Sequence, residues 1–374
     1  MRKAFAGMAA AVALGAFSFN VQAEEVDLNA LPSYKPEIKV QGVITVGGSY
    51  LRKYVQLLEA GFLKYHPDAE FANALYTSSE GAMAHLYISR VNIAPAGDDA
   101  KLTDIMPFHQ TFRYVPTEIS IATGGYQDRG TLWAFAVVVS KDNPLANLSV
   151  NQVEGIFGEA RTGGWEVEDN EWKYTAKYAR GADKDIRKWG QLGLTGDFAN
   201  HEIQTYAYNA PGFEIFFERN LFHWAHKWNP NLKEYVEPKQ TVAGKDGEVV
   251  ASDAILSAIE KDKYAIGIAA LMHVKDHPNL KVLAIGAKDG GPFVALTPET
   301  VRNRTYPFSR DAFVYINRAP GEKVDPKTRE FLRYVLSKEG QTIISNGEYE
   351  GVISDGKYNP LTPGYLKEQL KKLD

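Results

Sequence analysis

Two serine-bearing turns near the start of the chain carry the residue types best suited to bind a small anion. Ser49 follows the apolar run 43–48, and Ser78 with Ser79 follows the strand-like run 71–76; a helical pattern begins after each turn. The first turn of a helix leaves backbone N–H groups unpaired and carries partial positive charge, and a serine adds a hydroxyl donor. Two such helix ends directed at one cleft would hold an oxyanion with few or no cations. The first hypothesis is therefore a small-anion receptor.

Catalytic patterns are absent from the chain. The sequence has no His-Glu-x-x-His pair, nucleophile elbow, phosphate-binding glycine loop or dinucleotide fingerprint. His223 and His226 have the i, i+3 spacing of a helical metal pair, but histidines so spaced more often lie on a solvated helix face. We therefore predict neither enzymatic activity nor a metal or cofactor.

Residues 1–23 have the pattern of a secretory signal peptide. Arg2 and Lys3 precede an apolar stretch at 4–19, and Val21-Gln22-Ala23 is a small-x-small cleavage site, so the mature chain is expected to begin at Glu24. A buried N-terminal helix is the alternative interpretation. The chain has no cysteine, which excludes disulfides, thiolate metal sites and a lipid-modified N-terminal cysteine. These features predict a Gram-negative periplasmic protein that is not a lipoprotein.

The net charge of the chain argues against some classes of binding partner. The formal net charge is −4, and removal of Arg2 and Lys3 makes the mature chain more negative still. An acidic surface argues against nucleic acid and anionic membranes as partners. It also attracts no anion from a distance, so an anion site here must depend on local dipoles.

Strand-like and helix-like patterns alternate along the chain. Apolar alternation predicts strands at 38–46, 71–76, 91–96, 115–122, 132–139, 202–208, 265–269, 281–285 and 312–316. Helical spacing predicts helices at 49–65, 80–88, 148–158, 213–222, 253–261, 328–337 and 341–346, with a surface excursion at 159–175. Because strands and helices alternate, each sheet should be mostly parallel and flanked by helices. The apolar strands fall into two groups, which predicts two α/β lobes: residues 24–130 with 286–374, and residues 131–285.

Several stretches together resemble the periplasmic phosphate-binding proteins of ABC transporters. They include Gly47-Gly48-Ser49, Thr77-Ser78-Ser79-Glu80-Gly81, Ile93-Ala94-Pro95-Ala96-Gly97-Asp98, residues 137–144, residues 189–196, Tyr306-Pro307-Phe308-Ser309-Arg310 and Glu339-Gly340-Gln341. No single motif is specific, but their order and spacing from about residue 40 to 350 are. The resemblance implies a two-lobed type II binding-protein fold that closes on its ligand. It also implies a monomer that delivers phosphate or a related oxyanion to an inner-membrane permease.

By position in that family, the first-lobe contacts would be Ser49, Tyr50, Ser79 or Ser78, and Asp98. Each serine alone could simply cap a helix, but the pair in family register favours a ligand site. Asp98 could cap a turn, or it could accept a hydrogen bond from a protonated oxyanion and so discriminate against sulfate.

The chain departs from the family at the second-lobe anion motif. The expected arginine falls on Tyr208, and the expected Ser-Gly-Thr falls on Pro211-Gly212-Phe213. The two aromatic residues could pack between the lobes or line an organic ligand. Removing one partner of a buried charged pair costs roughly 2–5 kcal/mol, so a replacement cation is needed for tight binding. Arg90, Arg180 and Arg310 are candidates that the sequence does not rank. The alternative hypothesis is an interaction or sensory module of the same fold with no tight small ligand.

Overall fold

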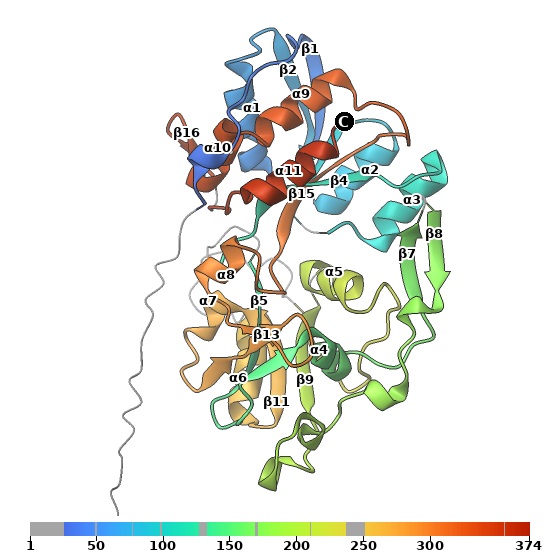
Figure 1. Cartoon of the computed structure of the whole chain (residues 1–374), viewed down its shortest axis with the longest axis vertical. Coiled ribbons are helices and arrows are strands. Elements are labelled where there is room, and N and C mark those ends of the chain that lie inside the picture. The colour runs from blue at the N-terminus through green and yellow to red at the C-terminus, as the bar shows by residue number, and fades with distance from the viewer. Residues whose placement is uncertain are drawn as a thin grey trace, which may run out of the picture.

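The computed structural model describes residues 26–48, 51–76, 78–97, 99–126, 133–168, 171–209, 211–236, 251–354 and 356–374. The expected signal peptide lies outside these residues, as do Ser49, Tyr50 and Asp98. The described part of the chain folds into two α/β lobes, one above the other in Figure 1. Among its helices, none has the length and apolar character needed to span a membrane.

The first lobe is built on a five-stranded sheet. Its strand order is β2 (Ala69–Tyr76), β1 (Gly42–Gly48), β3 (Ile93–Ala96), β15 (Asp311–Ile316) and β4 (Thr117–Thr123). β1 pairs in parallel with β2 and β3, whereas β15 runs antiparallel to both of its neighbours. β15 reverses direction because the chain re-enters this lobe there after passing through the other one.

Helices cover both faces of this sheet. One face carries α1 (Arg52–Leu63), α9 (Pro326–Val335), α10 (Lys338–Asn346) and α11 (Pro363–Lys371), and the other carries α2 (Ser79–Tyr87) and α3 (Leu102–Phe112). Side chains of β15 alternate between the two cores: Val314 joins the first cluster, while Phe313 and Tyr315 join the second. The hairpin of β16 (Glu348–Tyr349) and β17 (Val352–Ile353) adjoins α1 and α10.

The second lobe repeats this plan with a single large core. Its sheet has the order β10 (Lys233–Val236), β9 (Gln204–Asn209), β11 (Ala265–Ala270), β5 (Phe135–Ser140) and β12 (Leu280–Val282), again with two parallel and two antiparallel pairings. A smaller sheet joins β14 (Phe293–Val294), β13 (Ala284–Gly286) and β6 (Asn147–Ser149). The helices are α4 (Val150–Phe157), α5 (Pro211–Asn220), α6 (Ala251–Lys261), α7 (Leu271–Val274) and α8 (Pro298–Arg302).

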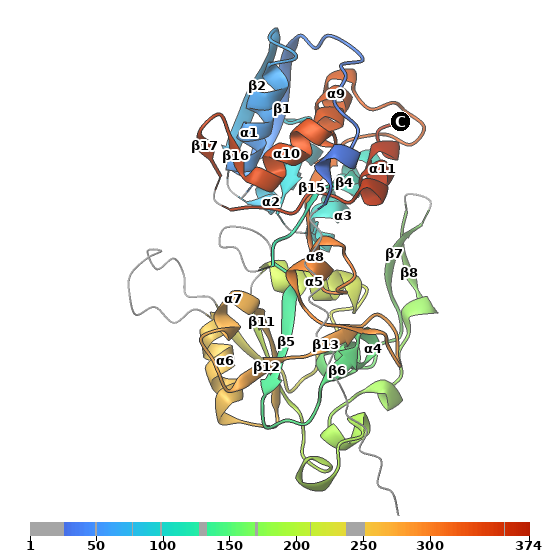
Figure 2. The same cartoon turned by 60° about the vertical axis from the view of Figure 1, so that its left-hand side comes forward.

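The expected surface excursion at 159–175 contains a two-stranded hairpin, β7 (Gly164–Glu168) with β8 (Glu171–Thr175). Figure 1 and Figure 2 both show this hairpin extending from the second lobe toward α3 of the first. His109 on α3 lies 3.3 Å from a carboxylate oxygen of Glu171 on β8, so the hairpin contacts the opposite lobe.

The two-lobed α/β architecture agrees with the sequence prediction. The side chains of Leu296, Val301, Tyr306 and Phe308 also join the second core. The boundary residues of the lobes stay a proposal.

Candidate functional site

The strands that precede the turns singled out from the sequence end at one edge of the first-lobe sheet. β1 lies between β2 and β3 and is parallel to both, so the carboxyl ends of the three strands share that edge. Gly47 packs so closely on α2 that an added Cβ would lie 3.2 Å from the Cα and Cβ of Ala82. The backbone N–H of Gly97, which follows β3, donates to the hydroxyl oxygen of Ser79 at 3.1 Å. The structure therefore brings together the ends of β1 and β3 and the first turn of α2.

The two serines of the second turn have different roles. Ser78 is the N-cap of α2, and its hydroxyl oxygen accepts the N–H of Gly81 at 3.2 Å. Ser79, the first residue of the helix, is 6% exposed and accepts from Gly97 across the sheet edge. A hydroxyl that accepts one bond keeps its own proton for another acceptor. Ser79 is therefore the better placed of the two to contact a ligand at this edge.

The segment that carries position 98 is anchored on both sides. Ser79 holds the N–H of Gly97, and the N–H of Ala100 donates to the hydroxyl of Tyr315 at 2.9 Å. Tyr315 in turn donates to Glu118 at 2.7 Å. This network fixes the backbone immediately before and shortly after the position where a ligand contact is expected.

An acidic residue in the first turn of α2 is compensated locally. Glu80 pairs with Lys101 at 2.5 Å. Burial alone would raise the pKa of the Glu80 carboxyl, but hydrogen bonds from Lys101 and Ser78 lower it below its usual value. The ion pair reduces the repulsion that Glu80 would exert on an anion at this helix end.

The altered motif of the second lobe keeps the strand-to-helix turn of the prediction. Tyr208 lies in β9, and Gly212 and Phe213 lie in the first turn of α5. The ring of Phe213 is 2% exposed and packs edge-to-face on Phe135, with 5.4 Å between ring centroids. Phe213 is thus part of the second-lobe core, and its assignment as a ligand contact stays a prediction. In both views α5 lies at the end of the second lobe that faces the first.

The three cations left open by the sequence lie in different places. Arg90 is exposed beyond the C-terminal end of α2. Arg180 pairs with Asp185 at 2.5 Å and lies 3.9 Å from Glu154, in the second lobe. Arg310 lies on the segment that returns from the second lobe to β15, between the two lobes. Of the three, Arg310 is the one placed at the junction of the lobes.

An arginine that sequence reasoning missed joins the two lobes directly. Arg219, near the end of α5, makes hydrogen bonds of 2.8 and 2.9 Å to the two carboxylate oxygens of Glu118 and one of 2.7 Å to Asp99. Burial disfavours the charged form of Glu118, but the nearby guanidinium outweighs this effect and lowers the pKa of that carboxyl. Because Asp99 follows position 98, this interlobe ion cluster of Arg219, Asp99 and Glu118 borders the candidate site.

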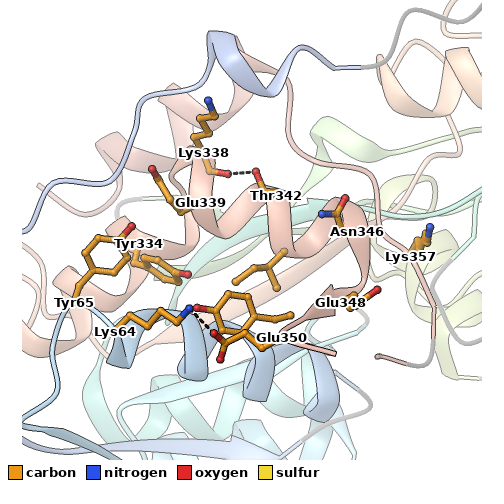
Figure 3. Close-up of a pocket in the computed structure, with 12 residues that line it drawn as sticks. Lys64, Tyr65, Tyr334, Lys338, Glu339, Thr342, Asn346, Glu348, Glu350 and Lys357 are labelled. Atoms are coloured by element: carbon orange, nitrogen blue, oxygen red, sulfur yellow. Dashed lines mark hydrogen bonds and ion pairs between the residues drawn. The ribbon is translucent and has the colours of Figure 1, made fainter. Parts of the chain in front are cut away.

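A pocket of about 780 Å³ lies elsewhere, on the outer side of the first lobe between α1 and α10. Figure 3 shows its lining, in which Lys64 pairs with Glu350 at 2.5 Å. Lys338 donates to Asn29 at 2.7 Å, and Glu339 accepts the N–H of Tyr34 at 2.6 Å. With its charges mixed in sign and engaged locally, this pocket has no preference for an anion.

Comparisons with known proteins agree with the fold. A family model described as "PBP superfamily domain" matches residues 42–339. "Phosphate-binding protein PstS" of Pseudomonas aeruginosa is 26% identical over 345 residues, covering 92% of this chain and 91% of that protein. "Protein SphX" of Synechococcus elongatus is 23% identical over 213 residues, covering 56% of this chain and 50% of that protein.

A solved structure supports the same architecture. PstS from Borrelia burgdorferi superimposes with a TM-score of 0.50 at 14% identity, covering 83% of this chain and 99% of that chain. At this identity the likeness concerns the fold alone. The family model, in contrast, spans well over half of the sequence and includes both sheets. The chain therefore belongs to the PBP superfamily.

Proposed function

We propose that this protein is a periplasmic substrate-binding protein that captures phosphate or a related oxyanion between its lobes and delivers it to an ABC permease. It acts without catalysing a reaction and as a monomer. The observation that carries the proposal is the hydrogen bond between Ser79 and Gly97, which brings the helix end of α2 to the end of β3. Helix N-termini and backbone N–H groups gathered in this way suit an oxyanion.

On this proposal the first lobe contributes most of the ligand contacts. Ser49, Tyr50 and Ser79 donate, Ser78 acts chiefly as the helix cap, and Asp98 accepts a hydrogen bond from the O–H of a protonated oxyanion. In the second lobe the contacts come from Tyr208 in β9 and from Gly212 and Phe213 in the first turn of α5. The name and coverage of the Pseudomonas aeruginosa relative support phosphate as the first ligand to test.

One observation favours the alternative function, an interaction module with no tight small ligand. The interlobe ion cluster holds the lobes together through groups of the protein itself. If closure needs no ligand, the closed form could present a constant surface to an envelope partner. This alternative predicts that phosphate has no effect on the protein.

The experiment that tests the proposal is calorimetry on the chain from Glu24, unfolded and refolded to remove bound ligand, with sulfate as the control anion. We expect phosphate to bind with a dissociation constant near 1 μM, about −8 kcal/mol, while sulfate gives no heat. An absence of both heat and thermal shift with millimolar phosphate would contradict the proposal and favour the interaction module.

A further inference from the structure

Two segments of the chain pass side by side between the lobes. The outgoing segment includes residues 123–126 and 133–135, and the returning segment includes residues 306–311. The N–H of Gly124 donates to the carbonyl of Arg310 at 2.7 Å, and the N–H of Phe135 donates to the carbonyl of Phe308 at 3.1 Å. We call these the crossing segments. Any group that points from them toward the space between the lobes can contact a ligand held there.

The guanidinium of Arg310 lies beside the second-lobe half of the candidate site. Arg310 is 6% exposed, and its Cζ lies 4.9 Å from the centroid of the Phe135 ring. Phe135 contacts Phe213, which belongs to the first turn of α5. The ring of Phe135 therefore lies between the guanidinium of Arg310 and Phe213, at the helix end where the expected arginine and hydroxyls are missing.

Two neutral donors on the crossing segments are buried without a partner. The hydroxyl oxygen of Ser309 and the indole Nε1 of Trp133 have no hydrogen-bond partner among the residues that the structure describes. A buried donor left unpaired costs about 1–3 kcal/mol, so an acceptor is expected where such donors occur. Along its own segment, each residue lies between the two positions that join the segments. This observation is independent of the position of Arg310 and points to an acceptor from outside the protein.

The side-chain chemistry of arginine suits a ligand of this kind. Arginine stays charged at any working pH and offers five N–H donors in a planar fork, which matches the oxygens of a tetrahedral oxyanion.

We infer that Arg310 supplies the cation of the oxyanion site, with Ser309 and Trp133 as neutral donors, in place of the side chains missing from the second lobe. This inference rests on the proposed function and deepens it. The ligand approaches the crossing segments from between the lobes, so its charge lies against these segments and the helix ends. The chemical class of the ligand is a tetrahedral oxyanion.

The test measures the affinity of inorganic phosphate for the wild-type chain and for R310Q, R310K, S309A and W133F, with the exposed Arg90 changed to Gln as the control. We expect R310Q to weaken binding at least about thirtyfold, since one partner of a buried charged contact is lost. R310K keeps the charge without the fork and should lose less. S309A and W133F should each weaken binding, while R90Q should match the wild type.

Unfolding of the ligand-free variants separates binding from structure. S309A and W133F remove donors that have no partner among the described residues, so their melting temperatures should equal or exceed that of the wild type. Weakened binding without loss of stability would support the inference. Folded R310Q that binds within threefold of the wild type would overturn it. Should R310Q fail to fold, wild-type affinity in both R310K and S309A would overturn it instead.

Parallel titrations with methylphosphonate and sulfate distinguish this inference from the proposed function. Binding of one of these anions that depends on Arg310, with no binding of phosphate, would support the inference and overturn phosphate as the ligand. A wild-type chain that binds none of the three anions would overturn both.

Discussion

Ser79 carries two functions that can be separated by comparing it with its neighbour. Its hydroxyl accepts the N–H of Gly97, and on our proposal its proton goes to the ligand. Ser78 instead caps α2 through the N–H of Gly81. Changing Ser79 to Ala should lower the free energy of unfolding by about 1–3 kcal/mol, because the buried N–H of Gly97 loses its acceptor.

The same substitution should weaken phosphate binding about tenfold or more, as measured by calorimetry. S78A is the matched control: losing the cap should cost about 0.5–2 kcal/mol of stability with a smaller effect on affinity. Equal losses of affinity in S78A and S79A would show that both act through the stability of α2 alone.

Glu59 on α1 makes stability depend on pH. Its side chain is buried, and one carboxylate oxygen has no hydrogen-bond partner among the described residues. Burial raises the pKa of this carboxyl from 4.5 to about 7, although a hydrogen bond from Asn73 acts in the opposite direction. The folded state therefore holds the proton more tightly than the unfolded state, and this stabilisation is present below pH 4.5 and lost as the pH rises through 7.

Glu59→Gln removes the ionisation and should raise the free energy of unfolding at pH 8 by up to about 3 kcal/mol, with little change at pH 4.5. Thermal unfolding across this pH range would measure the effect. The exposed Glu70 on adjacent β2 provides the control, because E70Q makes the same chemical change at the surface. A constant offset for E59Q across the range would contradict the predicted titration.

At the scale of elements, sequence patterns predict well where a strand passes into a helix. The β1, β2 and β9 turns all fall where alternation gives way to helical spacing, because burial of one side of each element produces the pattern. Helix α3 was missed, since Pro107 lies inside it and interrupts the usual signal. The hairpin of β7 and β8 was expected only as a surface excursion, because its charged and aromatic residues have no clear period.

Contacts between lobes could not be predicted from the sequence. Arg219 meets partners 101 and 120 residues away, and no local pattern relates such positions. The same is true of Arg310, whose sequence motif was noted but whose place beside Phe135 depends on the crossing of the chain. The candidate first-lobe turns were predictable because each is local; the charges that complete a site between lobes are not.

For the whole molecule, the interlobe ion cluster should set the balance between open and closed forms. Arg219 joins α5 of the second lobe to Asp99 and Glu118 of the first, and the hairpin adds the contact between His109 and Glu171 on the same side. About a third of the Arg219 side chain (33%) is exposed, so salt should weaken these ion pairs. When part of the ligand-free population is already closed, the conformational free-energy cost of ligand binding is smaller. Fewer molecules then need to close when the ligand arrives.

Arg219→Gln should therefore open the ligand-free protein. Hydrogen bonds to charged groups are worth about 1.5–3 kcal/mol, which corresponds to a shift of roughly ten- to a hundredfold in the ratio of closed to open forms. Small-angle X-ray scattering should detect a larger radius of gyration for R219Q, and the wild type should expand toward it in high salt. R329Q is the matched control, because Arg329 also binds two carboxylates, those of Glu37 and Asp374, but within one lobe. If R219Q and R329Q scatter like the wild type at every salt concentration, the cluster does not govern closure, and the closed form must depend on the ligand or on the packing of the crossing segments.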